Sequence, residues 1–144
     1  MKKRKNMLIT ILLTAFLLAI IVCFSIFTGF HDKKTVKFLN KHKAAEYIKS
    51  GWIPSNIPEN AKNIILYYDV DTNEINGSFQ STQEYISKFK ENLDKIEKEE
   101  FIHKKRIVYS KFKSITNRNV SFYKNESYFF IIEDHTIYFF SLDS

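Results

Sequence analysis

The chain has 144 residues, of which 44% are hydrophobic and 26% charged, and its formal net charge is +6. The first five residues hold four of the 22 basic side chains, so residues 31–144 carry 18 basic against 16 acidic groups, a net charge of +2. This near balance argues against a protein that binds nucleic acid by bulk positive charge. The same 114 residues suffice for one domain with a single core and are too few for two.

An uncharged run, MLITILLTAFLLAIIVCFSIFTGF, covers residues 7–30 directly after the basic tail. A helix over this run would be roughly 36 Å long, enough to cross a bilayer with some tilt. We therefore predict a basic cytoplasmic tail over 1–6 and a single transmembrane anchor over 7–30. Lysines also follow the run, but the short, dense basic tail favours a cytoplasmic N-terminus, with residues 31–144 outside the cytoplasm.

Two other interpretations of this run stay open. Cys23 follows an apolar stretch, as the lipidated cysteine of a bacterial lipoprotein does, although Val22 stands where a small residue is usual. Residues 25–27 offer a weak signal for cleavage and export. Because Cys23 is the only cysteine, the domain after the run cannot form a disulfide of its own, which fits a bacterial envelope protein.

Residues 31–50 predict a helix that connects the anchor to the domain. Asp32 is placed to cap its beginning, and Gly51 stands where a helix end favours glycine. Pro54 and Pro58 then forbid a regular helix, so Trp52, Ile53 and Ile57 are expected to plug the core as the chain crosses it.

The next segments predict a hairpin and an amphipathic helix. Residues 63–70 have the β-branched and aromatic content of a strand, and residues 77–80 offer a shorter partner across a turn. Ser81 and Glu84 form the pattern of a capping box. The helix that this box opens would present one apolar face at helical spacing, made of Ile86, Phe89, Leu93 and Ile96.

Four further strands are predicted, over residues 106–112, 120–124, 127–133 and 136–141, because short polar turns separate runs of apolar and aromatic residues. We therefore expect an α+β protein: an N-terminal transmembrane helix followed by one small domain, over residues 51–144, with an antiparallel sheet and two helices. Whether the first hairpin joins the main sheet is left open.

One segment resembles a pattern seen in small uncharacterised bacterial envelope proteins, many of them lipoproteins. The resemblance covers about residues 50–80 and rests on Gly51-Trp52-Ile53-Pro54, Ile57-Pro58, Ala61, Asn63-Ile64, Asp71-Thr72-Asn73 and Phe79. Asn60 before Ala61 departs from the pattern. The resemblance implies an envelope location and transfers no catalytic residue.

No catalytic or cofactor-binding pattern is present in the sequence. Residues 69–73 match the opening D-x-D-x-N of a calcium loop, but Glu74 and Gln80 stand where that loop requires Gly and Glu, so a hydrogen-bonded β-turn is favoured. The four histidines lack metal-ligand spacing, and no glycine-rich phosphate loop or nucleophile elbow occurs. We expect no catalytic residue, metal or cofactor.

Aromatic residues stand side by side in the last two predicted strands, as Tyr128-Phe129-Phe130 and Tyr138-Phe139-Phe140. Since neighbouring side chains of a strand point to opposite faces, both sheet faces receive aromatics. Core burial on both faces explains this simply; a partner surface around Phe129 and Phe139 is the functional interpretation. We predict an extracytoplasmic interaction domain that binds an envelope protein and no nucleic acid. A cell-wall glycan-binding module, or a hydrolase using carboxylates such as Glu133 and Asp134, is the alternative.

Overall fold

The computed structural model describes residues 11–23 and 33–142, which belong to two separate compact units, one up to residue 32 and one from residue 33. In the first unit, residues 11–23 form an exposed apolar helix. No helix among the described residues is long and apolar enough to span a bilayer. The predicted tail over 1–6 lies outside the described residues, and so do residues 7–10 and 24–30 of the predicted anchor over 7–30.

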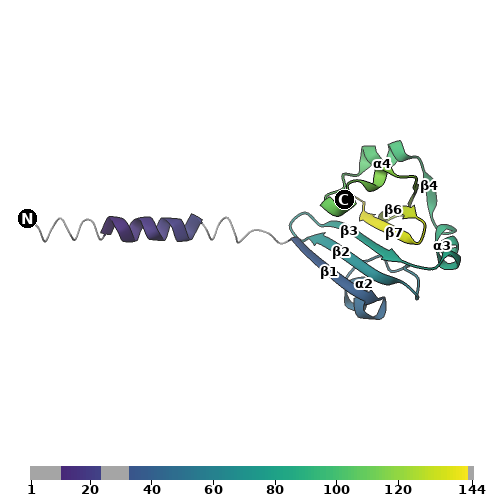
Figure 1. Ribbon diagram of the computed structural model, residues 1–144, viewed down its shortest axis with the longest axis horizontal. Coiled ribbons are helices and arrows are strands. Elements are labelled where there is room, and N and C mark those ends of the chain that lie inside the picture. Colours follow the sequence, from purple (N-terminus) through teal and green to yellow (C-terminus); the bar gives the residue numbers. More distant parts are fainter. Residues whose placement is uncertain (1–10, 24–32, 143–144) are drawn as a thin grey trace, which may run out of the picture. The chain divides into compact units, whose positions relative to one another are not determined.

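The second unit is built on one antiparallel sheet of seven strands (Figure 1). The order across the sheet is β1-β2-β3-β7-β6-β5-β4, so the first hairpin joins the main sheet through β3 and β7. The strands are β1 (Lys33–Asn40), β2 (Lys62–Asp69), β3 (Glu74–Gln80), β4 (Asp94–Ile96), β5 (Ser121–Lys124), β6 (Tyr128–Glu133) and β7 (Thr136–Ser141). The expected α+β class and antiparallel sheet are confirmed.

Gly77 permits a close approach at the centre of the sheet. It is paired with Phe139 across β3 and β7, and a Cβ atom on Gly77 would lie only 2.0 Å from the Phe139 ring. The ring therefore lies directly over the glycine backbone. A glycine in a strand interior often marks such a contact, and no other residue fits here without displacing the ring.

The first face of the sheet is covered by two helices and the proline-containing segment. Helix α2 (Ala45–Lys49) follows the 3₁₀ turn η1 (His42–Ala44), and α3 (Gln83–Lys90) directs Ile86 and Phe89 into the core. Ile53 and Ile57 are buried there, as the sequence predicts, and Trp52 packs against the same cluster. Gly51 ends the preceding turn at φ +79°, and its carbonyl accepts a hydrogen bond from the Tyr128 hydroxyl at 2.7 Å.

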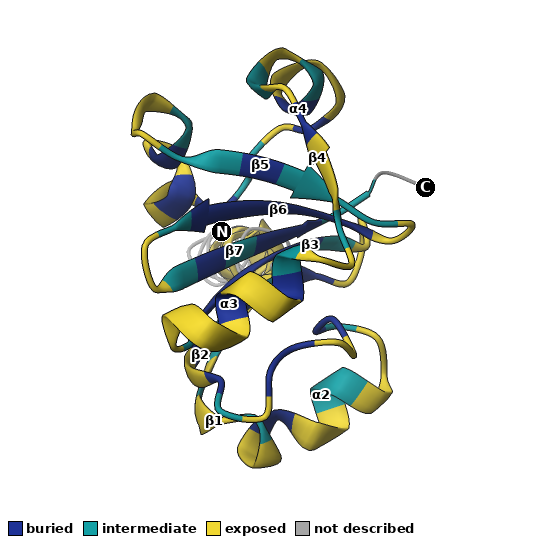
Figure 2. Cartoon of the chain, turned by 90° about the vertical axis from the view of Figure 1, so that its right-hand side faces the viewer, coloured by how far each residue is buried: buried dark blue, intermediate teal, exposed yellow. Residues whose placement is uncertain are grey.

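The second face has its own apolar cluster, under α4 (Lys98–Lys104) and the 3₁₀ turns η2 (Ser110–Phe112) and η3 (Ile115–Asn117). Phe101 of α4 packs against Phe122, Phe129 and Phe140 at ring distances of 5.4–5.5 Å. The central strands are consequently buried on both faces, as the dark blue of β6 in Figure 2 shows.

The predicted connecting helix over 31–50 is wrong for most of its length. Residues 33–40 form strand β1, and only five residues, Ala45–Lys49, are α-helical. Val36 and Phe38 alternate with exposed Lys37 and pack on the core, while Leu39 points away and is 76% exposed. This two-residue period is that of a strand, so the domain begins with β1 rather than at residue 51.

Two further predictions are corrected. Residues 106–112 are not a strand, because the backbone N–H groups of Val108 and Tyr109 donate to the side chain of Asn76 and the segment crosses the second face. The predicted helix stops at Lys90, and Ile96 belongs to β4. The three C-terminal strands β5, β6 and β7 are where the sequence predicts them.

The predicted capping box is also wrong. Thr82, not Ser81, is the N-cap of α3, and it makes no side-chain cap hydrogen bond. Instead the Ser81 hydroxyl donates to Asn60 Oδ1 at 2.6 Å, and Asn60 Nδ2 donates to Thr82 Oγ1 at 3.1 Å. These residues therefore fasten the loop before β2 to the start of the helix.

Candidate functional site

Phe129 and Phe139, the residues predicted to form a partner surface, are core residues. They are 1% and 0% exposed and belong to the clusters on opposite faces of the sheet. Neither side chain is available on the surface of the described domain, so this assignment is corrected. Their burial under two layers accounts for the aromatic runs, and partner binding itself stays a prediction.

A surface pocket of about 240 Å³ lies on the second face, and three neighbouring strands form its floor. Strand pairing sets Ile65 beside Ser78 and Ser78 beside Tyr138 in one row. Gln80 and Thr136 are paired in the next row, where the Asn63 amide also donates to Gln80 Oε1 at 2.7 Å. Since directly opposite residues of antiparallel strands share a face, this floor follows from the register alone. We call it the sheet pocket.

The wall of the sheet pocket comes from η2, from η3 and from the residue after η3, which contribute Lys111, Phe112, Ile115 and Arg118. Phe112 and Ile115 are buried and anchor the wall on the second apolar cluster. Lys111 and Arg118 stay exposed. Within eight residues, this segment therefore exposes two basic side chains to solvent and buries two apolar ones in the core.

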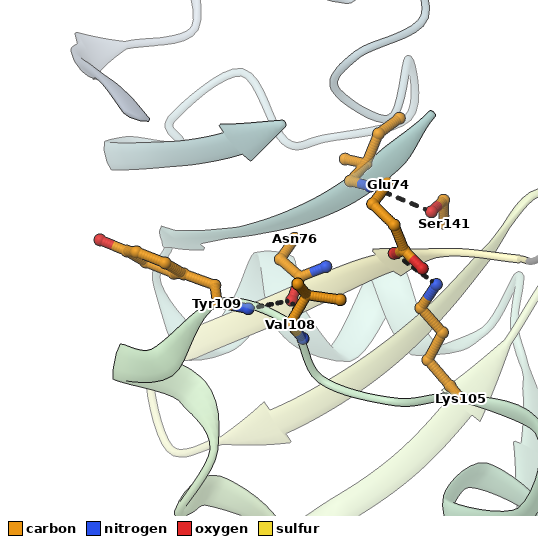
Figure 3. Close-up of polar contacts among 7 residues, drawn as sticks. Glu74, Asn76, Lys105, Val108, Tyr109 and Ser141 are labelled. Carbon is orange, nitrogen blue, oxygen red and sulfur yellow. Dashed lines mark hydrogen bonds and ion pairs between the residues drawn. The ribbon is translucent and has the colours of Figure 1, made fainter. Parts of the chain in front are cut away.

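A buried asparagine fixes the segment that leads into this wall (Figure 3). Asn76 Oδ1 accepts hydrogen bonds from the N–H groups of Val108 at 3.1 Å and Tyr109 at 3.0 Å. Asn76 is fully buried, and its Nδ2 has no partner in the part of the chain that the structure describes. Because unpaired backbone N–H groups are costly to bury, these two bonds favour this path for the segment at Val108 and Tyr109.

A buried ion pair lies beside the asparagine (Figure 3). The ammonium group of Lys105 lies 2.8 Å from Glu74 Oε2, and the Lys105 side chain is fully buried. At the same end of β3, Ile75 N–H donates to the Ser141 hydroxyl at 3.1 Å. These contacts join the segment before η2 to the central strands.

The charges of the sheet pocket do not cancel. Arg118 Nη1 donates to Glu133 Oε2 at 2.9 Å, and the Tyr138 hydroxyl donates to the same oxygen at 3.4 Å. Burial, and then the neighbouring Glu133 carboxylate, raise the pKa of Tyr138, so its hydroxyl keeps its proton at neutral pH. Lys111 has no ion pair among the described residues. With one carboxylate against two cations, the pocket carries a net charge of about +1.

Ser78 presents an unused hydroxyl at the pocket floor. The residue is only 6% exposed and lines the pocket, yet its hydroxyl makes no hydrogen bond within residues 33–142. The hydroxyl is not among the buried unpaired atoms of the described residues, so it is open to the pocket and can donate to or accept from a ligand.

Strand β1 forms a second exposed feature, at one edge of the sheet (Figure 1). It pairs with β2 from Lys33 to Asn40, and no other described strand pairs with its outer side. Lys34, Lys37 and Leu39 are all exposed on it. Lys33 approaches Asp69 at 3.7 Å, whereas Lys34 and Lys37 have no ion pair among the described residues.

The calcium-like segment is a β-turn, as favoured. Residues 70–73 connect β2 to β3, and Asp69 Oδ1 accepts a hydrogen bond from Asp71 N–H at 3.1 Å. In the described parts of the chain no three His, Cys, Asp or Glu residues gather closely enough to hold a metal ion. Of the carboxylates named for a hydrolase, Glu133 is paired with Arg118, and Asp134 is an exposed turn residue at φ +47°.

Sequence reasoning missed both exposed features. Alternation of Lys and apolar residues over 33–38 could have indicated β1. For the sheet pocket no local signal exists, because its residues come from five segments between Asn63 and Tyr138.

Comparison with known proteins gives one partial match. A search of curated proteins and a search of solved structures both returned no match. A family model, the YbbD head domain, matches residues 32–80, which span β1, α2, β2 and β3. About a third of the chain is therefore similar to a YbbD head domain, and that third includes the edge strand.

Proposed function

We propose that this chain is a membrane-tethered, noncatalytic domain that binds an extended acidic segment of an envelope protein along strand β1. The observation that carries the proposal is the edge itself: eight residues of regular strand with an outer side that no described strand occupies. An extended segment can add to such an edge, with main-chain hydrogen bonds supplying affinity and alternate side chains supplying specificity.

Charge on β1 favours an acidic occupant. Strand β1 contains three lysines, Lys33, Lys34 and Lys37, and no acidic residue. Lysine on an edge strand discourages pairing with a second copy of the same strand, because like charges would then lie side by side. An acidic strand would instead neutralise Lys34 and Lys37, and Leu39 would gain an apolar contact.

The placement at the membrane rests on the sequence. Residues 7–30 hold no charged side chain and follow a basic tail, as an uncleaved signal anchor does. The similarity of residues 32–80 to the YbbD head domain and the resemblance of residues 50–80 to envelope proteins support an extracytoplasmic domain. Lipidation at Cys23 would tether the domain equally well.

Photocrosslinking in intact cells tests the binding edge. A photoreactive residue at Leu39, which is 76% exposed on β1, should capture a protein with an acidic segment. The matched control is Ile102, which is 54% exposed on α4 at the second face and should capture none. Equal capture at both positions, or none at Leu39, would contradict binding along β1.

Charge reversal sharpens the test. Lys34→Glu with Lys37→Glu should abolish capture from position 39, since acidic groups would then repel the acidic segment. Lys95→Glu with Lys98→Glu, at the far end of the sheet and on α4, should leave capture unchanged. A loss of capture in both pairs would indicate a general charge effect and overturn the β1 site.

The anchor is tested separately by the mass of the protein extracted from membranes. We expect residues 7–30 to be retained in full. A mature N-terminus at Cys23 carrying lipid would replace the anchor with a lipid tether, and one beyond residue 30 would overturn membrane tethering.

A further inference from the structure

We propose that the sheet pocket is a second binding site, independent of the β1 edge, and that it takes a small sugar acid: one carboxylate on a hydroxylated body. Nothing in the matched family description or in the sequence patterns assigns a ligand to it. Three features of the pocket lead to this choice: its charge, its polar lining and its size.

The charge selects a monoanion. Lys111 and Arg118 both line the pocket, and only Arg118 is paired with a carboxylate, that of Glu133, so a single negative charge would balance the remaining positive charge. A carboxylate carries one negative charge at neutral pH, and Arg and Lys are its usual partners.

The remaining lining suits hydroxyl groups. Ser78 and Thr136 offer hydroxyls that can donate or accept, Asn63 and Gln80 offer amides, and the Tyr138 hydroxyl stays protonated. Ser78 is largely buried as a residue, and its hydroxyl is open to the pocket with no hydrogen bond to the described residues. A purely apolar ligand would displace water from the Ser78 and Thr136 hydroxyls without replacing its hydrogen bonds, at a cost in affinity.

Size and shape suit a single ring. The volume of about 240 Å³ is smaller than the roughly 300–1,000 Å³ of pockets for drug-sized ligands, so one sugar unit is the appropriate scale. Phe112 provides an aromatic side chain at the wall beside the polar groups. Arg118 is held by Glu133 in the free protein, which keeps its guanidinium in place for a second acceptor.

Equilibrium dialysis of the full chain in detergent, with radiolabelled glucuronate, tests the site. Glucose serves as the neutral analogue and acetate as a carboxylate without the ring. We expect glucuronate to bind measurably more tightly than either, and its binding to weaken as salt is added. Equal binding of glucose would overturn the role of the carboxylate. Equal binding of acetate would overturn the sugar acid, and absence of all binding would overturn the site.

Variants locate the binding. Lys111→Gln and Ser78→Ala each remove one ligand contact and no hydrogen bond or ion pair within residues 33–142, so both should fold normally. Loss of one hydrogen bond to a charged group should weaken glucuronate binding about tenfold in Lys111→Gln. Lys95→Gln, which removes the same charge from an exposed position on β4, is the matched control. Equal weakening in Lys95→Gln, or none in Lys111→Gln, would place the binding outside the sheet pocket.

Arg118→Gln and Arg118→Lys add a test of geometry. Arg118→Gln leaves the Glu133 carboxylate uncompensated at the pocket, so glucuronate binding should be lost almost entirely. Arg118→Lys should restore part of it, because the charge returns without the forked donor set. If Arg118→Gln bound glucuronate as the unmodified chain does, the assignment would be wrong whatever the fate of β1 binding.

Discussion

The two faces of the sheet are covered by different means. On the first face, α2, α3 and the proline-containing segment pack apolar side chains against Phe79, Phe130 and Phe139. On the second, one helix and two 3₁₀ turns cover a smaller cluster, and the path to these turns is fixed by Asn76 and by the Lys105–Glu74 pair. A layer with little regular structure must satisfy its backbone polar groups through side chains.

The difference bears on function. Covering the second face with short turns leaves the sheet pocket between η2, η3 and the strands, whereas α3 lies across the first face with its apolar side buried. The less regular layer supplies Lys111 to the sheet pocket from η2 and Arg118 from the end of η3. Four measurements, in order of decreasing expected effect, can break or sharpen this comparison.

The largest effect should come from removing one buried ring on each face. Phe89→Ala removes a ring that meets Phe79 at 5.9 Å and Phe130 at 5.1 Å, and Phe101→Ala removes the centre of the second cluster. Each should lower the free energy of unfolding by about 3–5 kcal/mol, measured by denaturant titration. A change below about 0.5 kcal/mol for Phe101→Ala alone would mean that α4 is not a true core layer.

Overpacking tests the first face more finely. Gly77→Ala should cost about 1–3 kcal/mol of unfolding free energy, because the new methyl group must displace the Phe139 ring. In the Phe139→Leu background the same substitution should cost clearly less, since the ring that it meets is gone. An equal cost in both backgrounds would show that contact with this ring is not the cause.

Loss of the asparagine tests the second face. Asn76→Ala leaves the N–H groups of Val108 and Tyr109 without an acceptor, so it should cost about 1–3 kcal/mol and raise hydrogen exchange at both amides. Exchange on the first face, at Ile64 and Leu66, should change only with global stability. The exposed Asn119→Ala serves as control and should change neither quantity.

The smallest effect concerns the acid end of the pH range. Hydrogen bonds from Lys124 and Lys104 hold the pKa of Glu100 below its ordinary value, and the bond from Lys124 joins α4 to β5. A lowered folded-state pKa stabilises the protein above the unfolded pKa of about 4.5, and this stability is lost as pH falls through the folded pKa. The unfolding temperature should fall as the pH is lowered, and it should fall less in Glu100→Gln than in the unmodified chain. An equal fall of the unfolding temperature in both proteins would show that Glu100 does not contribute to acid sensitivity.

The sequence by itself determined the elements in which neighbouring residues all favour the same local structure. Strands β5, β6 and β7 were predictable because aromatic and β-branched runs alternate with polar turns. The turn at Gly51 was predictable because only glycine adopts its φ of +79° without strain, and Ile53 and Ile57 plug the core as expected.

Only the tertiary structure decided the rest. Local propensity favoured a helix over 31–50, but pairing of Lys33–Asn40 with β2 satisfies that backbone and buries Val36 and Phe38. The segment 106–112 has the composition of a strand, yet the N–H groups of Val108 and Tyr109 donate to the side chain of Asn76, more than 30 residues earlier in the chain. The sheet pocket likewise depends on strand order and register, which set Ile65, Ser78 and Tyr138 side by side, because long-range pairing is not encoded in any one segment.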